Sequence, residues 1–314
     1  IYWLLRRPFI ALLAGYIVAF TPYLQLKVGG HPSYGYMSII IGIIWLAILA
    51  LSRNKLIYQM LLGLLLGVAV YFDPYFILLS CVAMTAVIIG YIVSSHGKLL
   101  TKFGKAIKSL YIAAAVFLIT ILPLGITYIG NQNTIESFTG GARGGKENIV
   151  RASIICSNYP FEYFIPNENN YVLNKVTHGD YKKDIQSSYN LLKKECGIAE
   201  DSITISLVLA TTLLVFLIIG LWERFNKRRM RLYKLINPTT NISIKNITVI
   251  SGLIVAIAGI LALPALLFFG LIPTPSRMLI EITSMWRIIS RLYLLVLLGL
   301  TIGFAVALAY FSSF

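Results

Sequence analysis

Long apolar stretches with almost no charged side chains are the feature that most limits what this chain can fold into. Eight such windows occur, each close to the roughly 20 residues that a helix needs to cross about 30 Å of hydrocarbon. Lipid offers no partner for unpaired backbone N–H and C=O groups, and no alternating strand pattern is sustained, so each window is predicted to be a helix. The predicted helices are 8–24, 37–51, 56–72, 74–95, 110–130, 203–222, 247–270 and 288–311.

The composition leads to the same class of protein. Only 12% of the residues are charged and 58% are hydrophobic, whereas soluble domains average about 25% charged residues. The net charge of +15 could suggest a nucleic-acid partner, but the basic residues are segregated between apolar windows, which excludes that class. We therefore predict an all-α, polytopic membrane protein whose partner is the lipid bilayer, with about eight transmembrane helices: five in 1–130, a small extracytoplasmic cap in 131–202, and three in 203–314.

The distribution of Lys and Arg predicts an orientation, because basic residues in short loops stay on the cytoplasmic side. With the first residues in the cytoplasm, 15 of the 27 basic residues lie on that side, and Glu223 is their only acidic companion. We expect a multi-pass protein of the plasma membrane with 131–202 outside the cytoplasm. The basic clusters 98–108 and 224–234 are assigned to anionic headgroups, with binding of a regulator as the alternative.

The long external segment 131–202 contains two of the three cysteines, Cys156 and Cys196. An oxidising compartment would allow them to pair, and the disulfide would close a loop of about 40 residues. The alternative is that both remain thiols. Aromatic residues in this segment indicate a small ordered cap.

Two external positions could take part in chemistry. Asp73 lies between two apolar helices and precedes Pro74, so it could act on a substrate, cap the next helix, or do both. His31 and Tyr34 follow two glycines in the first external loop. The imidazole could bind a phosphate or transfer a proton, or both residues could belong to the aromatic belt at the membrane interface.

Three arginines border the last predicted helix on the external side, against the general charge trend. They are Arg277, Arg287 and Arg291. In a helix, Arg287 and Arg291 would share one face and could grip a phosphate bidentately. The alternative is that these side chains only extend toward the interface.

Four stretches carry a resemblance to a known family. They are 11–22 (ALLAGYIVAFTP) followed by Gly30-His31, 63–75 (GLLLGVAVYFDPY), 160–166 (PFEYFIP), and 275–277 with 286–291. In these stretches the chain resembles the GT-C superfamily of integral-membrane glycosyltransferases. The resemblance implies transfer of a sugar from a polyprenyl-phosphate donor to a cell-surface glycan or protein acceptor at the external face.

The resemblance also implies which residues act in catalysis and which bind the substrate. Asp73 and His31 are the catalytic candidates. Arg277, Arg287, Arg291, Tyr34 and Glu162 are the candidates for binding substrate and its phosphate. No cofactor is required by the motifs, although a divalent cation, Mg²⁺ or Mn²⁺, could take part.

The sequence departs from the family pattern at one place, and rival functions follow. The family has an acidic residue in the first external loop, whereas 25–36 offers only Lys27 and His31. Either further helices precede Ile1 in a longer protein, or this chain is not catalytic.

Two other functions compete with the glycosyltransferase hypothesis. One is a transporter or flippase of a lipid-linked precursor, and the other is a non-catalytic membrane subunit that anchors a surface partner. The middle thirds of the predicted helices lack charged residues, which argues against a coupled transporter.

Overall fold

A computed structural model describes most of the apolar part of the chain. The described residues are 7–20, 36–73, 75–94, 99–130, 175, 244–263, 266–267, 272–282 and 289–311. The predicted helix 203–222 and almost all of the predicted cap 131–202 lie outside them.

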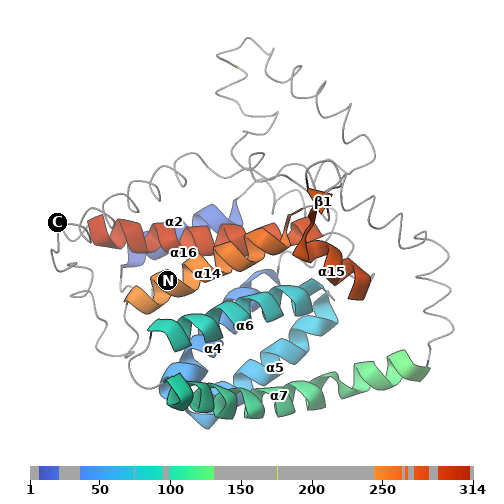
Figure 1. Cartoon of the computed structure of the whole chain (residues 1–314). Helices are drawn as coiled ribbons and strands as arrows, with labels where there is room; N and C mark the ends of the chain where they lie inside the picture. The colour runs from blue at the N-terminus through green and yellow to red at the C-terminus, as the bar shows by residue number, and fades with distance from the viewer. Residues whose placement is uncertain are drawn as a thin grey trace.

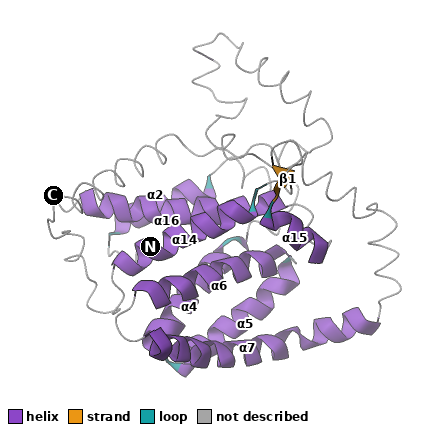
Figure 2. Ribbon diagram, viewed as in Figure 1, coloured by secondary structure: helices purple, strands orange, loops and turns teal. Residues whose placement is uncertain are grey.

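The described part is helical except for one pair of two-residue antiparallel strands (Figure 2). The longer helices are α2 (Pro8–Ala19), α4 (Ser38–Arg53), α5 (Leu56–Phe72), α6 (Tyr75–Ser94), α7 (Leu99–Gly130), α14 (Ile244–Leu261) and α16 (Tyr293–Phe311). The shorter elements are β1 (Leu266–Leu267), β2 (Ile272–Pro273), α15 (Pro275–Ile282) and the 3₁₀ helix η5 (Ile289–Leu292).

Seven of the predicted apolar windows overlap described helices, and α5 has the predicted bounds. The window 247–270 was wrong at its end, because α14 stops at Leu261 and β1 follows. Pro264 explains the early stop, since a proline removes a helical N–H and disfavours helix in the residue before it. The window 288–311 also begins differently, as the 3₁₀ turn η5 precedes α16.

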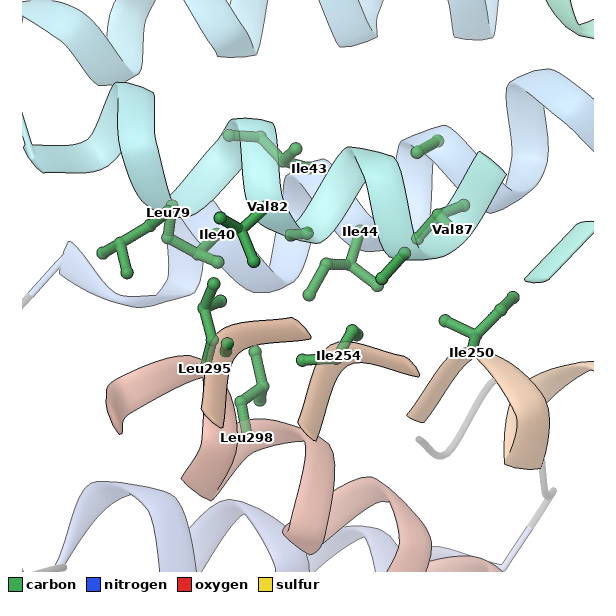
Figure 3. Packing of buried hydrophobic residues seen from close by; sticks show 14 of the residues in the cluster. Ile40, Ile43, Ile44, Leu79, Val82, Val87, Ile250, Ile254, Leu295 and Leu298 are labelled. Carbon is green, nitrogen blue, oxygen red and sulfur yellow. The ribbon is translucent and has the colours of Figure 1, made fainter. Parts of the chain in front are cut away.

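The helices pack in a sequence that differs from their order along the chain (Figure 1). From one side of the bundle to the other, α7 packs on α5, α5 on α4, α4 on α6, α6 on α14, α14 on α16, and α16 on α2. The central four helices bury a continuous aliphatic cluster (Figure 3) that includes Ile40, Ile43 and Ile44 of α4, Leu79, Val82 and Val87 of α6, Ile250 and Ile254 of α14, and Leu295 and Leu298 of α16.

Two glycines allow α5 and α7 to approach closely. A Cβ atom on Gly63 would lie 2.3 Å from the backbone oxygen of Ala113, and one on Gly67 would lie 2.5 Å from the side chain of Thr120. Glycines four residues apart are a common contact between membrane helices, where small residues let backbones meet and van der Waals packing holds them together. Because both contact positions advance along both helices, α5 and α7 run parallel.

Further contacts fix which helix ends lie together. Gly90, near the end of α6, meets Ile250, near the start of α14. The hydroxyl of Ser109 in α7 lies 3.1 Å from Oδ1 of Asn54, which ends α4. One end of the bundle therefore collects the α4–α5 turn, the end of α6, and the starts of α7 and α14. We call it the basic end, because the described charged residues of these segments are all basic: Arg53, Lys55, Lys102, Lys105, Lys108 and Lys245.

A polar cluster fastens three helices at the basic end. Asn54 has a left-handed backbone conformation (φ 49°) that ends α4, which asparagine tolerates better than most residues. Its side-chain oxygen accepts hydrogen bonds from Gln59 Nε2 (2.9 Å) and Ser109 Oγ (3.1 Å). Gln59 and Ser109 are both buried, so this cluster satisfies polar groups inside an apolar bundle and joins α4, α5 and α7.

The other end of the bundle holds the α5–α6 junction, the end of α14, and η5. We call it the Asp73 end. Its described aromatic residues include Tyr36 and Phe72, whose ring centroids are 4.7 Å apart. Aromatic rings of this kind are enriched where membrane helices leave the hydrocarbon.

By length and composition, α6 and α7 are the described helices that could cross a membrane. The apolar window of α6 is 56% buried, whereas that of α7 is only 6% buried. Helix α7 therefore presents apolar side chains outward along its length. The other apolar helices are shorter, so the number of spans stays a prediction.

Candidate functional site

Asp73 is the N-cap of α6. Its backbone is extended (φ −162°, ψ 131°), and its Oδ1 accepts a hydrogen bond of 2.8 Å from the backbone N–H of Tyr75. Its carbonyl oxygen accepts a second bond, of 2.9 Å, from the N–H of Phe76. The carboxylate thus satisfies a helix N–H that has no partner within the helix, and its negative charge faces the positive end of the helix dipole. The capping alternative raised by the sequence is what the structure contains.

Arg291 reaches the same junction from the opposite end of the sequence. It belongs to η5, and its guanidinium carbon lies 4.0 Å from the centroid of the Tyr75 ring. A guanidinium over an aromatic face is attracted by the electron density of the ring. Tyr75 therefore contacts both candidates, Asp73 through its backbone N–H and Arg291 through its ring.

The Arg291 guanidinium is well shielded from water. Arg291 is 6% exposed and Tyr75 is 8% exposed. Arginine remains protonated in proteins, so a full positive charge lies near the end of an apolar bundle. Charge interactions are stronger there than in water, because the surroundings screen them less. The junction between α5 and α6 therefore has a poorly screened cation beside Tyr75.

A short helix adds hydroxyl groups and a third charge at this end. Thr274 caps α15, since its carbonyl oxygen accepts a hydrogen bond of 3.0 Å from the N–H of Arg277. The buried hydroxyls of Thr274 and Ser276 lie 2.7 Å apart. Helix α15 packs against α14, as η5 does. Half-buried Arg277 and buried Arg291 consequently lie at the same end of α14.

The remaining candidates lie outside the described residues. These are His31, Tyr34, Glu162, Arg287, and the cysteines Cys156 and Cys196. The predicted shared helical face of Arg287 and Arg291 stays a prediction, because Arg287 lies outside the described residues. Arg291 itself lies in the 3₁₀ helix η5. The third cysteine, Cys81, is an exposed free thiol in α6.

Sequence reasoning missed the role of Tyr75. A cation–π contact between residues more than 200 positions apart leaves no local spacing that could reveal it. The available signal was the position of Tyr75 directly after Asp73-Pro74, at the start of a helix whose first turn must face the same end as the carboxylate.

Metal ligands do not gather in the described part of the chain. No group of three or more His, Cys, Asp or Glu residues that could hold a metal ion occurs there.

Comparisons with models of protein families, with curated proteins and with solved structures found no match to this chain.

Proposed function

We propose that this chain is a membrane glycosyltransferase, or part of one, that transfers a sugar from a polyprenyl-phosphate carrier to a cell-surface acceptor. The proposal includes a multi-pass arrangement in the plasma membrane, with the Asp73 end outside the cytoplasm. The outward apolar surface supports the membrane environment. Large exposed apolar side chains occur on α2, α4, α5 and α7, and so much apolar surface is unfavourable in water.

The observation that carries the proposal is the grouping of Arg291, Tyr75 and Asp73 at one end of an apolar bundle. A lipid carrier holds its phosphate at the depth of the headgroups, near the ends of membrane helices. A cation in a poorly screened site at that depth would favour the phosphate, and would favour it more as negative charge grows on it.

In this reaction, Arg291, Arg277 and Asp73 have different roles. An acceptor hydroxyl attacks the anomeric carbon, the bond from that carbon to the phosphate oxygen breaks, and the oxygen keeps the electron pair. Arg291, aided by Arg277, stabilises the charge on the departing polyprenyl phosphate. Asp73 receives the proton or orients the sugar. Its capping bond is compatible with this role, because a carboxylate has about four acceptor positions.

Replacement of Arg291 tests the proposal. Membranes from cells that express the full chain are supplied with a labelled polyprenyl-phosphate sugar, and transfer to the acceptor fraction is measured. We expect Arg291→Ala to lower the transfer rate about 100-fold, the usual effect of removing one donor that stabilises transition-state charge. Arg291→Lys should recover part of the rate, since it keeps the charge but loses the planar donor geometry.

Arg53 provides the matched control at the other end of the bundle. Its Nη1 donates a hydrogen bond of 3.4 Å to the hydroxyl of Tyr58, so it is also an arginine paired with a tyrosine. Arg53→Ala should leave transfer within about twofold of the wild type, as expected for a weak interaction remote from the chemistry. Transfer that persists at the wild-type rate in Arg291→Ala, at equal protein levels, would contradict the proposed role.

A further inference from the structure

The first three turns of α7 carry three lysines whose environments differ. Lys102 is half-buried, and its Nζ donates a hydrogen bond of 2.9 Å to the backbone oxygen of Ile92 near the end of α6. Lys105 and Lys108 are exposed. A lysine bound to the last carbonyls of a helix stabilises that helix end. Lys102 therefore has a structural role that the other two lysines do not share.

An apolar surface accompanies the exposed lysines on the same turns. Leu100, Phe103, Ile107 and Tyr111 follow each other at intervals of three and four residues, which places them on one helix face. All are exposed, from 52% at Phe103 to 84% at Leu100. The opposite face, with Ala106 and Ser109, is buried against the bundle. This combination of outward lysines and apolar side chains is typical of helices that lie in the membrane interface.

The length of α7 gives an independent argument. Its 32 residues extend about 48 Å at 1.5 Å per residue, while the hydrocarbon layer is about 30 Å thick. Roughly 12 residues exceed the hydrocarbon if the helix is upright. The C-terminal part of α7 after Lys108 has no charged residue through Gly130, so the excess belongs at the lysine-bearing start.

We propose that the first three turns of α7, residues 99–111, bind anionic lipid headgroups of the cytoplasmic leaflet through Lys105 and Lys108. The exposed apolar face lies at the boundary between the headgroups and the hydrocarbon, and the two ammonium groups bind lipid phosphates beside it. Lys102 takes no direct part, because its ammonium holds the end of α6. The inference rests on the membrane environment of the bundle and is independent of sugar transfer.

Local lipid enrichment beside α7 tests this inference. Gly104 lies between the lysines, and a side chain placed there meets no atom within 4 Å. A genetically encoded coumarin amino acid at position 104 reports on its neighbours in the full chain, reconstituted in phosphatidylcholine nanodiscs with about 30% phosphatidylglycerol. Quenching is compared between a small amount of doxyl-labelled phosphatidylglycerol and the same amount of doxyl-labelled phosphatidylcholine.

We expect the anionic quencher to be at least about twice as effective as the zwitterionic one, since each surface lysine attracts anionic lipid appreciably. The double variant Lys105→Gln/Lys108→Gln should bring the ratio close to one, whereas Lys102→Gln should leave it above one. Salt at about 1 M should also lower the ratio in the wild type, because it screens exposed charges.

Three results would overturn the inference. A ratio of one in the wild type would show that the segment is in the bilayer without lipid preference. Absence of quenching by either lipid would show that the segment is not at the membrane. A ratio unchanged in the double variant would show that Lys105 and Lys108 do not bind the headgroups.

Discussion

At the scale of single residues, Tyr75 joins the two halves of the candidate site. Its backbone N–H binds Asp73 and its ring lies under Arg291, so one residue connects the start of α6 to η5. Such a contact holds the guanidinium in place without neutralising it, since a cation–π interaction leaves the charge intact.

Among the described glycines, Gly63 is the one where a single added methyl group should do most harm to packing. In Gly63→Ala the new Cβ would lie 2.3 Å from the Ala113 oxygen, so α5 and α7 must separate. We expect a loss of about 1–3 kcal/mol in the free energy of unfolding, the usual range for overpacking. Thermal or denaturant unfolding of the purified chain in detergent measures this loss.

Gly125→Ala is the control for that prediction. Gly125 lies in α7, and a Cβ there meets no atom within 4 Å. Alanine favours helix over glycine by about 0.5–1 kcal/mol, so this variant should be as stable as the wild type or more stable. Equal destabilisation by both substitutions would contradict the close packing of α5 on α7.

At the scale of elements, two substitutions at the start of α6 distinguish a structural role of Asp73 from a chemical one. Asp73→Asn keeps an oxygen that can accept the Tyr75 N–H but removes the negative charge. Asp73→Ala removes both. We expect Asp73→Ala to lower the free energy of unfolding by about 1 kcal/mol and Asp73→Asn to change it little, because Asn and Asp are comparable N-caps.

The transfer activity of Asp73→Ala and Asp73→Asn should follow a different pattern from their stability. If Asp73 acts on the sugar or its proton, both variants should lose transfer, by at least about 100-fold as is usual for a general base. Parallel measurements of unfolding and transfer check this outcome. Full transfer by a normally stable Asp73→Asn variant would limit Asp73 to capping.

The helices themselves were largely predictable from the sequence, for a physical reason. An uncharged apolar run such as 56–72 has few alternatives to a buried or lipid-facing helix, and α5 has those bounds. Shorter features were missed. The paired strands β1 and β2 span two residues each and α15 spans eight, and a search for long apolar windows overlooks elements this short. Helix α7 starts at Leu99 instead of 110, because lysines are good helix formers even where they cannot enter lipid.

The candidate site was predictable only in its parts. Asp73 stood out as a carboxylate between two apolar helices, and both of its alternatives could be stated from the sequence. Arg291 stood out as an arginine on the external side. Their meeting through Tyr75 depends on how α6, α14 and α16 pack, and aliphatic core residues are too interchangeable to specify that packing from sequence alone.

At the scale of the whole molecule, the bundle has two chemically different ends. The basic end is fastened by the Asn54 cluster and carries lysines and Arg53. The Asp73 end carries the carboxylate, the aromatic residues and the shielded arginine. The positive-inside tendency would direct the basic end to the cytoplasm. Under the proposed function, the Asp73 end would then meet the lipid-linked donor and its acceptor on the outer surface.

Cysteine accessibility in intact cells tests this sidedness most directly. Tyr36→Cys reports on the Asp73 end and Lys105→Cys on the basic end, and both positions are exposed. In a background without the native cysteines, a membrane-impermeant maleimide should label the first variant from outside and the second only after the cells are opened. Labelling of both positions from the outside, or of Lys105→Cys alone, would contradict the account.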